Sequence, residues 1–349
     1  MDCSSTGATG ALDSMRRTLF GLCGAPGVAG LERGAARLAA EALAPLCGGV
    51  RADPLGSVVG TATGAGAHIL LEAHLDQIGM AVVGIEDGGF LRVTACGGMD
   101  RRVLCAQEVT IHGTEPLYGV IEAPAPHLTA DGRDKAIPES AILVDTGLPK
   151  GEAERQIPIG SRVTFRTAPA MLGAYRVTAP ALDNRAGVCA LLRCMELLQG
   201  QAHAPVTVLF AVQEETGHAG AMAAGFAAQP DRALVVDVSF AKAPGIPASQ
   251  AQGKLGGGTM VGFAPGLDHG MSETLCALAE REGIAHTREI MGGHSGTDAD
   301  SLQAAGRGVP CGLLSIPLRN MHTAAETADL RDIEATAQLL AAYVKEARV

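Results

Sequence analysis

The sequence predicts an α/β fold in which a mostly parallel sheet is flanked by helices and carries an inserted small β domain. Strand-like apolar runs alternate with amphipathic helical segments after residue 169, which is typical of a parallel sheet covered by helices. The segment 77–168 instead holds short alternating runs separated by Gly and Pro. The chain of 349 residues is 47% hydrophobic with no Trp, 3 Tyr and 7 Phe. Its core therefore consists of small aliphatic side chains, which let helices approach a sheet closely.

The first part of the chain opens with helical character and ends in a buried strand. Residues 11–47 contain apolar side chains at helical spacing. A short strand is expected near 57–60. The apolar run 68–73 predicts a stronger strand that ends directly before His74.

The segment 77–168 is predicted to be a separate, small β-rich domain. Its only helical pattern, at 150–156, is brief. The main domain would then consist of 1–76 and 169–349. The strands expected in the insertion are 80–85, 90–94, 109–112, 119–122 and 141–145.

From residue 169 onward the rhythm of strand and helix returns. The segment 185–199 predicts a helix because its apolar residues fall on one face. Gly283 would end a later helix, and the Gly-rich stretch 253–259 is expected to be a flexible surface loop. The further strands expected are 206–212, 233–236, 287–291 and 309–316, and the further helices are 217–228, 272–282 and 329–347.

Composition and charge argue against several classes of partner. A formal net charge of −10 disfavours nucleic acid, because phosphate binding requires clustered Lys and Arg. The nine cysteines are scattered and form no CxxC pair, which indicates reduced thiols. The N-terminus lacks a continuous apolar signal region, and no run approaches the ~18 apolar residues of a membrane span. We therefore expect a cytoplasmic protein that binds neither nucleic acid nor membranes.

Five short polar patches follow predicted strands or open a helix. In an open α/β sheet, ligands bind beyond the carboxyl ends of the strands, so these patches are expected at one edge. Two histidines and several carboxylates are what two closely spaced divalent cations require, because imidazole and carboxylate suit zinc or cobalt and one carboxylate bridges the pair. An unligated carboxylate nearby would move a proton. The residues are His74 with Asp76, Asp183, Glu214 with Glu215, Asp237, and His322.

These patches resemble those of the M42 family of metallo-aminopeptidases, which includes glutamyl, deblocking and tetrahedral aminopeptidases. The resemblance runs from about residue 20 to the C-terminus. Its specific part is Ala73-His74-Leu75-Asp76 with Gly79, Ala181-Leu182-Asp183-Asn184-Arg185, Glu214-Glu215-Thr216-Gly217, Val236-Asp237 and Met321-His322. Lesser matches are Asp53-Pro54-Leu55-Gly56, Gly119-Val120-Ile121 with Pro126-His127, Val144-Asp145-Thr146-Gly147 and Gly296-Thr297-Asp298-Ala299.

The resemblance implies two divalent metal ions per chain, zinc or cobalt. Asp183 would bridge the two ions. His74 and Asp237 would complete one site, and Glu215 and His322 would complete the other.

The resemblance also implies catalytic roles, substrates and assembly. Glu214 would be the general base, taking a proton from the attacking water and returning it to the leaving amine. Asp76 would orient His74 without binding a metal ion itself. The fold would be that of co-catalytic metallopeptidases acting on short peptides, with 1–76 and 169–349 as the catalytic domain. The insertion 77–168 would be a dimerisation domain, and relatives assemble dimers into a hollow tetrahedral dodecamer.

Other functions fit parts of the same pattern. Deacylation of an N-acyl amino acid, or a related amidase reaction, would use the same metal site. An endoglucanase could use Glu214 with a second carboxylate as an acid/base pair, but glycoside hydrolysis gives no role to His74 and His322. A binding or shell protein with a decayed centre is disfavoured because every mapped ligand is present.

The remaining histidines are expected to be surface or packing residues. His294 lies in a Gly-rich loop and is expected near the site without binding metal. Asp298 is interpreted first as a helix cap. Ser295 lacks a nucleophile-elbow context, which argues against serine hydrolysis. The histidines without an expected role in the site are His68, His112, His127, His203, His218, His269 and His286.

Overall fold

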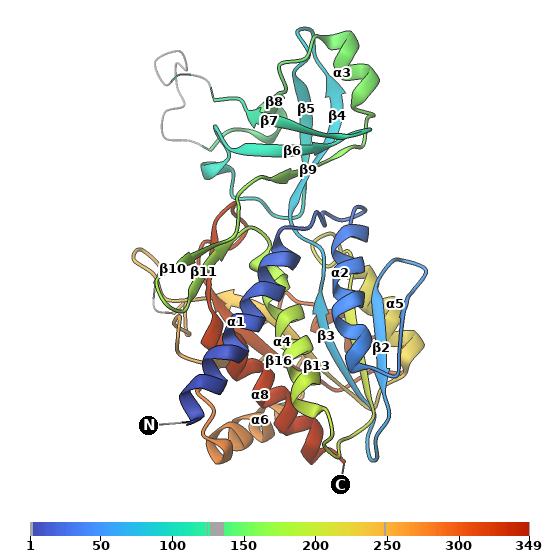
Figure 1. Cartoon of the computed structure of the whole chain (residues 1–349), viewed down its shortest axis with the longest axis vertical. Coiled ribbons are helices and arrows are strands. Elements are labelled where there is room, and N and C mark those ends of the chain that lie inside the picture. The colour runs from blue at the N-terminus through green and yellow to red at the C-terminus, as the bar shows by residue number, and fades with distance from the viewer. Residues whose placement is uncertain (1–2, 124, 126–135, 248, 349) are drawn as a thin grey trace.

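The computed structural model describes residues 3–123, 125, 136–247 and 249–348. Pro126 and His127, which belong to one of the lesser family matches, lie outside the described residues. Figure 1 shows two parts, a layered α/β domain that contains both chain ends and a small barrel at the opposite end of the long axis.

An eight-stranded sheet forms the middle layer of the larger part. Its central strands β12, β3, β13 and β16 are parallel, so their carboxyl ends meet at one edge. The strands in spatial order are β1 (Gly49–Ala52), β2 (Val58–Ala62), β12 (Val206–Ala211), β3 (Ile69–His74), β13 (Arg232–Phe240), β16 (Cys311–Leu318), β14 (Thr259–Phe263) and β15 (His286–Ile290).

The sheet is mixed: four of its seven strand pairings are parallel and three are antiparallel, so the prediction of a mostly parallel sheet is confirmed in part. β1 and β2 form a hairpin whose turn is closed by Asp53, because its Oδ1 accepts the backbone N–H groups of Leu55, Gly56 and Ser57 at 2.9, 2.8 and 2.9 Å. A turn this short can only join antiparallel strands. β2 is also antiparallel to β12, and β14 is antiparallel to β16. Beyond the central block, β14 and β15 are parallel to each other but run opposite to the block.

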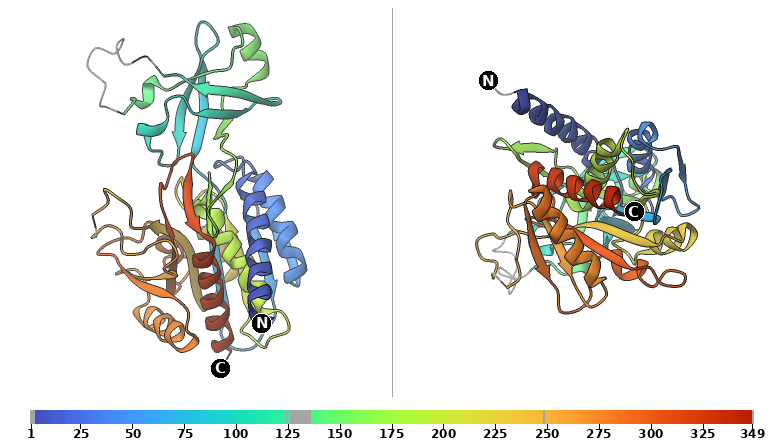
Figure 2. Two further views of the ribbon diagram at one scale, coloured as in Figure 1. Left: turned by 60° about the vertical axis from the view of Figure 1, so that its left-hand side comes forward. Right: turned by 90° about the horizontal axis from the view of Figure 1, so that it is seen from below.

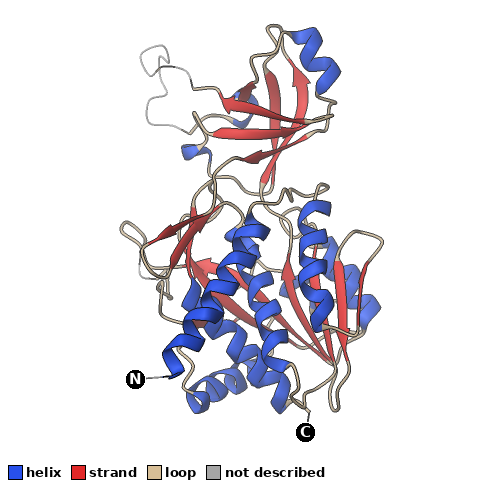
Figure 3. Cartoon of the chain, in the orientation of Figure 1, coloured by secondary structure: helices blue, strands red, loops and turns tan. Residues whose placement is uncertain are grey.

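Helices cover both faces of the sheet, as the sequence predicts (Figure 3). Successive residues of β3 point to opposite faces, so Leu71 packs in the larger hydrophobic core and Leu70 in the smaller one. On the face that carries the larger core, α8 and α6 pack side by side (Figure 2). The helices of that face are α1 (Cys3–Cys23), α2 (Arg33–Leu43), α4 (Leu182–Leu198), α6 (His269–Glu282) and α8 (Leu330–Glu346), and those of the other are α5 (Ala219–Ala228) and α7 (Ala299–Leu302).

The smaller part is a closed barrel with a hydrophobic core of its own, which includes Met80, Val109 and Val163. Ala324, from the turn after β16, packs against this core and so links the barrel to the larger part. The strands in barrel order are β4 (Gly79–Ile85), β5 (Leu91–Cys96), β8 (Leu143–Asp145), β7 (Pro116–Ile121), β6 (Glu108–His112) and β9 (Arg162–Phe165), with α3 (Lys150–Gln156) beside them.

A small three-stranded sheet, which the sequence does not predict, connects the segment before α4 with the segment after β16. β11 (Arg176–Ala179) pairs with β10 (Ala170–Leu172) on one side and with β17 (Glu326–Asp329) on the other. Three-residue and four-residue strands carry too little alternation to be read from sequence. Short 3₁₀ turns occur at η1 (Ala44–Leu46), η2 (Arg101–Val103) and η4 (Glu139–Ala141).

The Gly-rich loop at 253–259 is present but is held by hydrogen bonds. The N–H groups of Gly256 and Gly258 donate to the buried carboxylate of Asp332 at 2.8 and 2.7 Å, and Thr259 already begins β14. Within the described part of the chain, no helix combines the length and the apolar character needed to cross a membrane.

Candidate metal centre

The five predicted metal ligands converge at the carboxyl edge of the parallel block, although they lie far apart in the sequence. Neighbouring strands of the block carry three of the segments that reach this edge, and α4 and the turn after β16 supply the others. The five are His74, the last residue of β3; Asp237 in β13; Glu215 in the turn after β12; Asp183 at the start of α4; and His322 between β16 and β17.

The ligands form two clusters that share Asp183. In the first, His74 Nε2 lies 3.0 Å from Asp183 Oδ1 and 3.6 Å from Asp237 Oδ1. In the second, His322 Nε2 lies 3.2 Å from Asp183 Oδ2 and 3.3 Å from Glu215 Oε1. Atoms that bind one tetrahedral ion at about 2.0–2.1 Å lie roughly 3.3 Å from one another. The spacing and the donor types therefore fit two divalent cations with one carboxylate between them.

The charges of the cluster are unbalanced without cations. Burial raises the pKa of Asp237 to about 6 and also raises the pKa of Glu215. Burial opposes protonation of His322, but hydrogen bonds to Asp183 and Glu215 raise its pKa to about 11. Burial would raise the pKa of Asp183, but hydrogen bonds from His322 and His74 hold it below its ordinary value. No Lys or Arg is among the described residues that line this pocket. Two cations would supply the missing positive charge.

Asp76 lies behind the centre and connects two of its segments. Its carboxylate accepts the backbone N–H groups of Glu214 and Glu215 at 2.9 and 3.1 Å. The Asp76 carbonyl oxygen is 3.2 Å from His74 Nδ1, and its carboxylate is 3.6 Å from the same atom. Asp76 is fully buried and does not line the pocket. Its contacts are those of a residue that orients His74 and the turn after β12.

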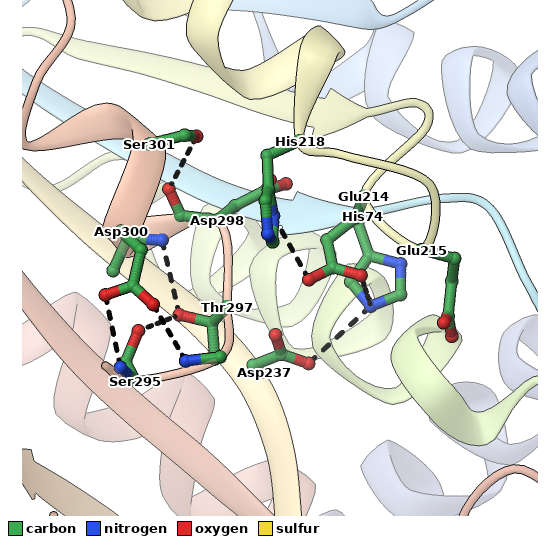
Figure 4. A network of polar contacts seen from close by, with 12 residues as sticks. His74, Glu214, Glu215, His218, Asp237, Ser295, Thr297, Asp298, Asp300 and Ser301 are labelled. Carbon is green, nitrogen blue, oxygen red and sulfur yellow. Dashed lines mark hydrogen bonds and ion pairs between the residues drawn. The ribbon is translucent and has the colours of Figure 1, made fainter. Parts of the chain in front are cut away.

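Glu214 lies beside the two clusters and belongs to neither of them. Its Oε2 is 4.0 Å from His74 Nε2, and its Oε1 is 3.3 Å from His218 Nδ1 (Figure 4). Burial raises the pKa of this carboxyl group to about 8. A pKa near the working pH is what a general base requires. The pocket onto which Glu214 faces has a volume of about 310 Å³, the size of a small-ligand site.

His218 and Asp298 are part of the site, which the sequence analysis does not predict. The chain turns sharply after Glu214, with the His218 N–H donating to the Gln213 carbonyl at 2.9 Å, and this turn brings the imidazole back over Glu214. Asp298 precedes α7 but makes no side-chain capping bond; it faces His218 instead. The sequence feature that could have pointed to His218 is its position four residues after the predicted base, Glu214.

Glu326 is a further residue that sequence reasoning misses. It is 1% exposed, and its carboxylate accepts the backbone N–H groups of Asp183 and His322 at 2.9 and 2.8 Å. Burial, reinforced by the charge of Asp183, raises its pKa. Its position follows from the pairing of β17 with β11, which places Glu326 opposite Ala179. Two ligand-bearing segments are thus joined by one buried carboxylate.

The chain is similar to known aminopeptidases along most of its length. The M42 glutamyl aminopeptidase family matches residues 56–339. A lysyl aminopeptidase from Pyrococcus furiosus is 32% identical over 327 residues, which cover 92% of this chain and 94% of that protein. The structure of an aminopeptidase from the archaeon Desulfurococcus kamchatkensis has a TM-score of 0.90 and 31% identity, covering 96% of this chain and 95% of that one. The Pyrococcus horikoshii TET1 peptidase has a TM-score of 0.84 and 28% identity, covering 95% and 99%. As the resemblance in its sequence indicates, the chain belongs to the M42 family of metal-dependent aminopeptidases, which are peptide-bond hydrolases.

Proposed function

We propose that this aminopeptidase removes N-terminal residues from short peptides with two divalent cations, zinc or cobalt, held on either side of Asp183. The observation that carries the proposal is that the two oxygens of the Asp183 carboxylate face different histidines: Oδ1 faces His74 and Oδ2 faces His322. Asp237 would complete the first site and Glu215 the second. Imidazole and carboxylate ligands suit both metals, so the donor set alone does not choose between them.

In this proposal the reaction divides between the cations and Glu214. Bound cations would lower the pKa of the attacking water and polarise the scissile carbonyl. Glu214 takes the proton from that water and delivers it to the leaving amine nitrogen. Asp76 keeps Glu214 in place by accepting a hydrogen bond from its backbone N–H. The carbonyl oxygen of Asp76 contacts His74 Nδ1 and so orients the imidazole ring.

Metal analysis combined with a substrate panel tests this function. We expect two ions per chain and hydrolysis of aminoacyl p-nitroanilides, with no release of acid from N-acetyl amino acids. The reverse substrate pattern would replace the peptidase proposal with an amidase or deacylase using the same site. Glu214→Gln should keep both ions and lose about 10²- to 10⁴-fold in kcat, the usual range for a general base. Normal turnover by that variant would contradict the assignment of the base.

The barrel is proposed to be the dimerisation domain, with residues 77–168 as its bounds. The barrel exposes the apolar side chains of Val83, Tyr118 and Ile159, which a partner chain packed against the barrel would bury. The TET1 peptidase of P. horikoshii assembles into a tetrahedron or a large octahedral shell, and a dodecamer of a related chain is also known. Light scattering of the purified protein should show a dimer or a multiple of it; a monomer at micromolar concentration would contradict the proposal.

We place the enzyme in the cytoplasm. The eight cysteines whose side chains are described are all free thiols, which suits a reducing compartment. Fractionation of cells that express the protein, with detection of the full-length chain, would test this location.

A further inference from the structure

A third group of ionisable side chains adjoins the two proposed metal sites. His218 Nδ1 lies 3.0 Å from Asp298 Oδ1 and 3.3 Å from Glu214 Oε1. Figure 4 shows Glu214 between His218 on one side and His74 on the other. The two oxygens of Glu214 therefore have different partners: Oε1 faces His218, and Oε2 faces His74 and the metal centre.

The direction of the hydrogen bonds follows from the chemistry of the partners. Two carboxyl oxygens surround His218 Nδ1, and Glu214 in the ionised form that acts as a base only accepts hydrogen bonds. Nδ1 must therefore carry the hydrogen, which fixes the tautomer of the ring. Asp298 is 1% exposed and cannot turn to solvent, so it holds the ring in one orientation.

The loop that carries Asp298 is itself held in place. The backbone N–H groups of Ser295 and Gly296 donate to the Asp300 carboxylate at 3.1 and 2.8 Å, and Thr297 Oγ1 accepts from Ala299 N–H at 3.2 Å (Figure 4). These bonds order the loop around Asp298, so the chain presents Asp298 to His218 from a rigid support.

We propose that His218, fixed by Asp298, is a positioning residue that holds the Glu214 carboxylate by its Oε1 and so leaves Oε2 directed at the attacking water. The inference rests on the proposed role of Glu214 as the base. The polar side-chain partners of His218 among the described residues are Glu214 and Asp298, and neither is a proposed metal ligand, so its loss should affect turnover and leave the cations in place. Misplacing a catalytic group by about 1 Å can cost about 100-fold in rate.

Two substitutions at residue 218 separate positioning from folding. His218 has φ +60°, a left-handed conformation that Gly and Asn adopt with little strain. His218→Gly removes the donor, and His218→Asn restores an N–H donor near the place of Nδ1. His269→Gly, at an exposed histidine that begins α6, serves as the control for loss of a histidine.

We expect His218→Gly to lower kcat by about 10- to 100-fold on the best p-nitroanilide, with KM within about threefold and two ions still bound. His218→Asn should recover kcat to within about threefold, and Asp298→Ala should lower kcat without changing KM, as His218→Gly does. Wild-type kcat in His218→Gly, or loss of metal from it, would overturn the proposal, as would equal activity of the Gly and Asn variants. Glu214→Gln, assayed in parallel, separates the two claims: its inactivity together with a fully active His218→Gly would refute only the positioning role.

Discussion

Glu326→Gln tests how the two ligand-bearing segments are held. The wild-type carboxylate accepts one backbone N–H from Asp183 and one from His322, at separate oxygens. A glutamine has one carbonyl oxygen, so its NH₂ group would face one of the two buried donors. A buried donor left without an acceptor costs about 1–3 kcal/mol. The variant should therefore lose about that much stability in the metal-free state.

The effect on metal binding should differ between the two sites. Asp183 and His322 are two of the three ligands in the second cluster, whereas only Asp183 belongs to the first. His322 also has φ +61°, a left-handed conformation that costs a non-glycine residue about 1–2 kcal/mol unless other contacts hold it. If the ion must re-order this segment when it binds, the roughly 1–3 kcal/mol lost by the variant is subtracted from the binding free energy. The affinity for the ion would then be about 5- to 150-fold weaker. The affinity for the second ion, the one proposed to bind Asp183, Glu215 and His322, should fall most.

Chelator competition and calorimetry would measure both ions, and urea unfolding in EDTA would measure stability. Asp332→Asn is the matched control, because Asp332, in the first turn of α8, is also buried and accepts two backbone N–H groups, but its donors, Gly256 and Gly258, belong to the loop before β14 and not to a segment with a proposed metal ligand. It should lose similar stability while keeping wild-type affinity for both ions. A Glu326→Gln protein with unchanged affinity for the second ion would refute this reasoning.

Two further predictions concern the surroundings of the second metal site. A Cβ at Gly97 would lie 3.0 Å from Glu215 Oε2 and 2.8 Å from the Ile78 side chain, at φ +82°, whereas one at Gly245 (φ +84°) would meet nothing within 4 Å. Both alanine variants should lose about 1–2 kcal/mol in denaturant unfolding, but only Gly97→Ala should bind the second ion more weakly; equal metal affinity would contradict the close approach. Since the pKa of His322 is raised to about 11 in the metal-free protein, an incoming cation must displace a proton at neutral pH, so metal affinity should rise with pH below 11. Calorimetry in buffers of different ionisation enthalpy should detect the released proton, and binding that is independent of pH would contradict this.

Segments that carry proposed metal ligands could be predicted where the ligand has a strong local context. His74 is the last residue of a fully buried strand, and Glu215 lies in the turn after another. Long apolar runs reveal buried strands, and parallel topology then places their ends at one edge. Lys150–Gln156, the helix beside the barrel, was also recognisable from its local pattern.

The supporting residues could not be predicted because they depend on turns and on pairing between distant short strands. Glu326 reaches the site only because β17 pairs with β11, and both strands have only four residues. Asp298 looks like an ordinary helix cap in the sequence, and only the tertiary fold turns it toward His218. The sequence also does not give the direction of each outer strand, since direction follows from connections that apolar patterning does not encode.

Anomalous diffraction from crystals loaded with zinc or cobalt tests the central claim most directly. The account predicts two peaks about 3.5–4 Å apart, one on either side of the Asp183 carboxylate. One should be bound by His74 and Asp237, and the other by Glu215 and His322. A single peak, or two peaks that do not both contact Asp183, would contradict the shared-carboxylate centre.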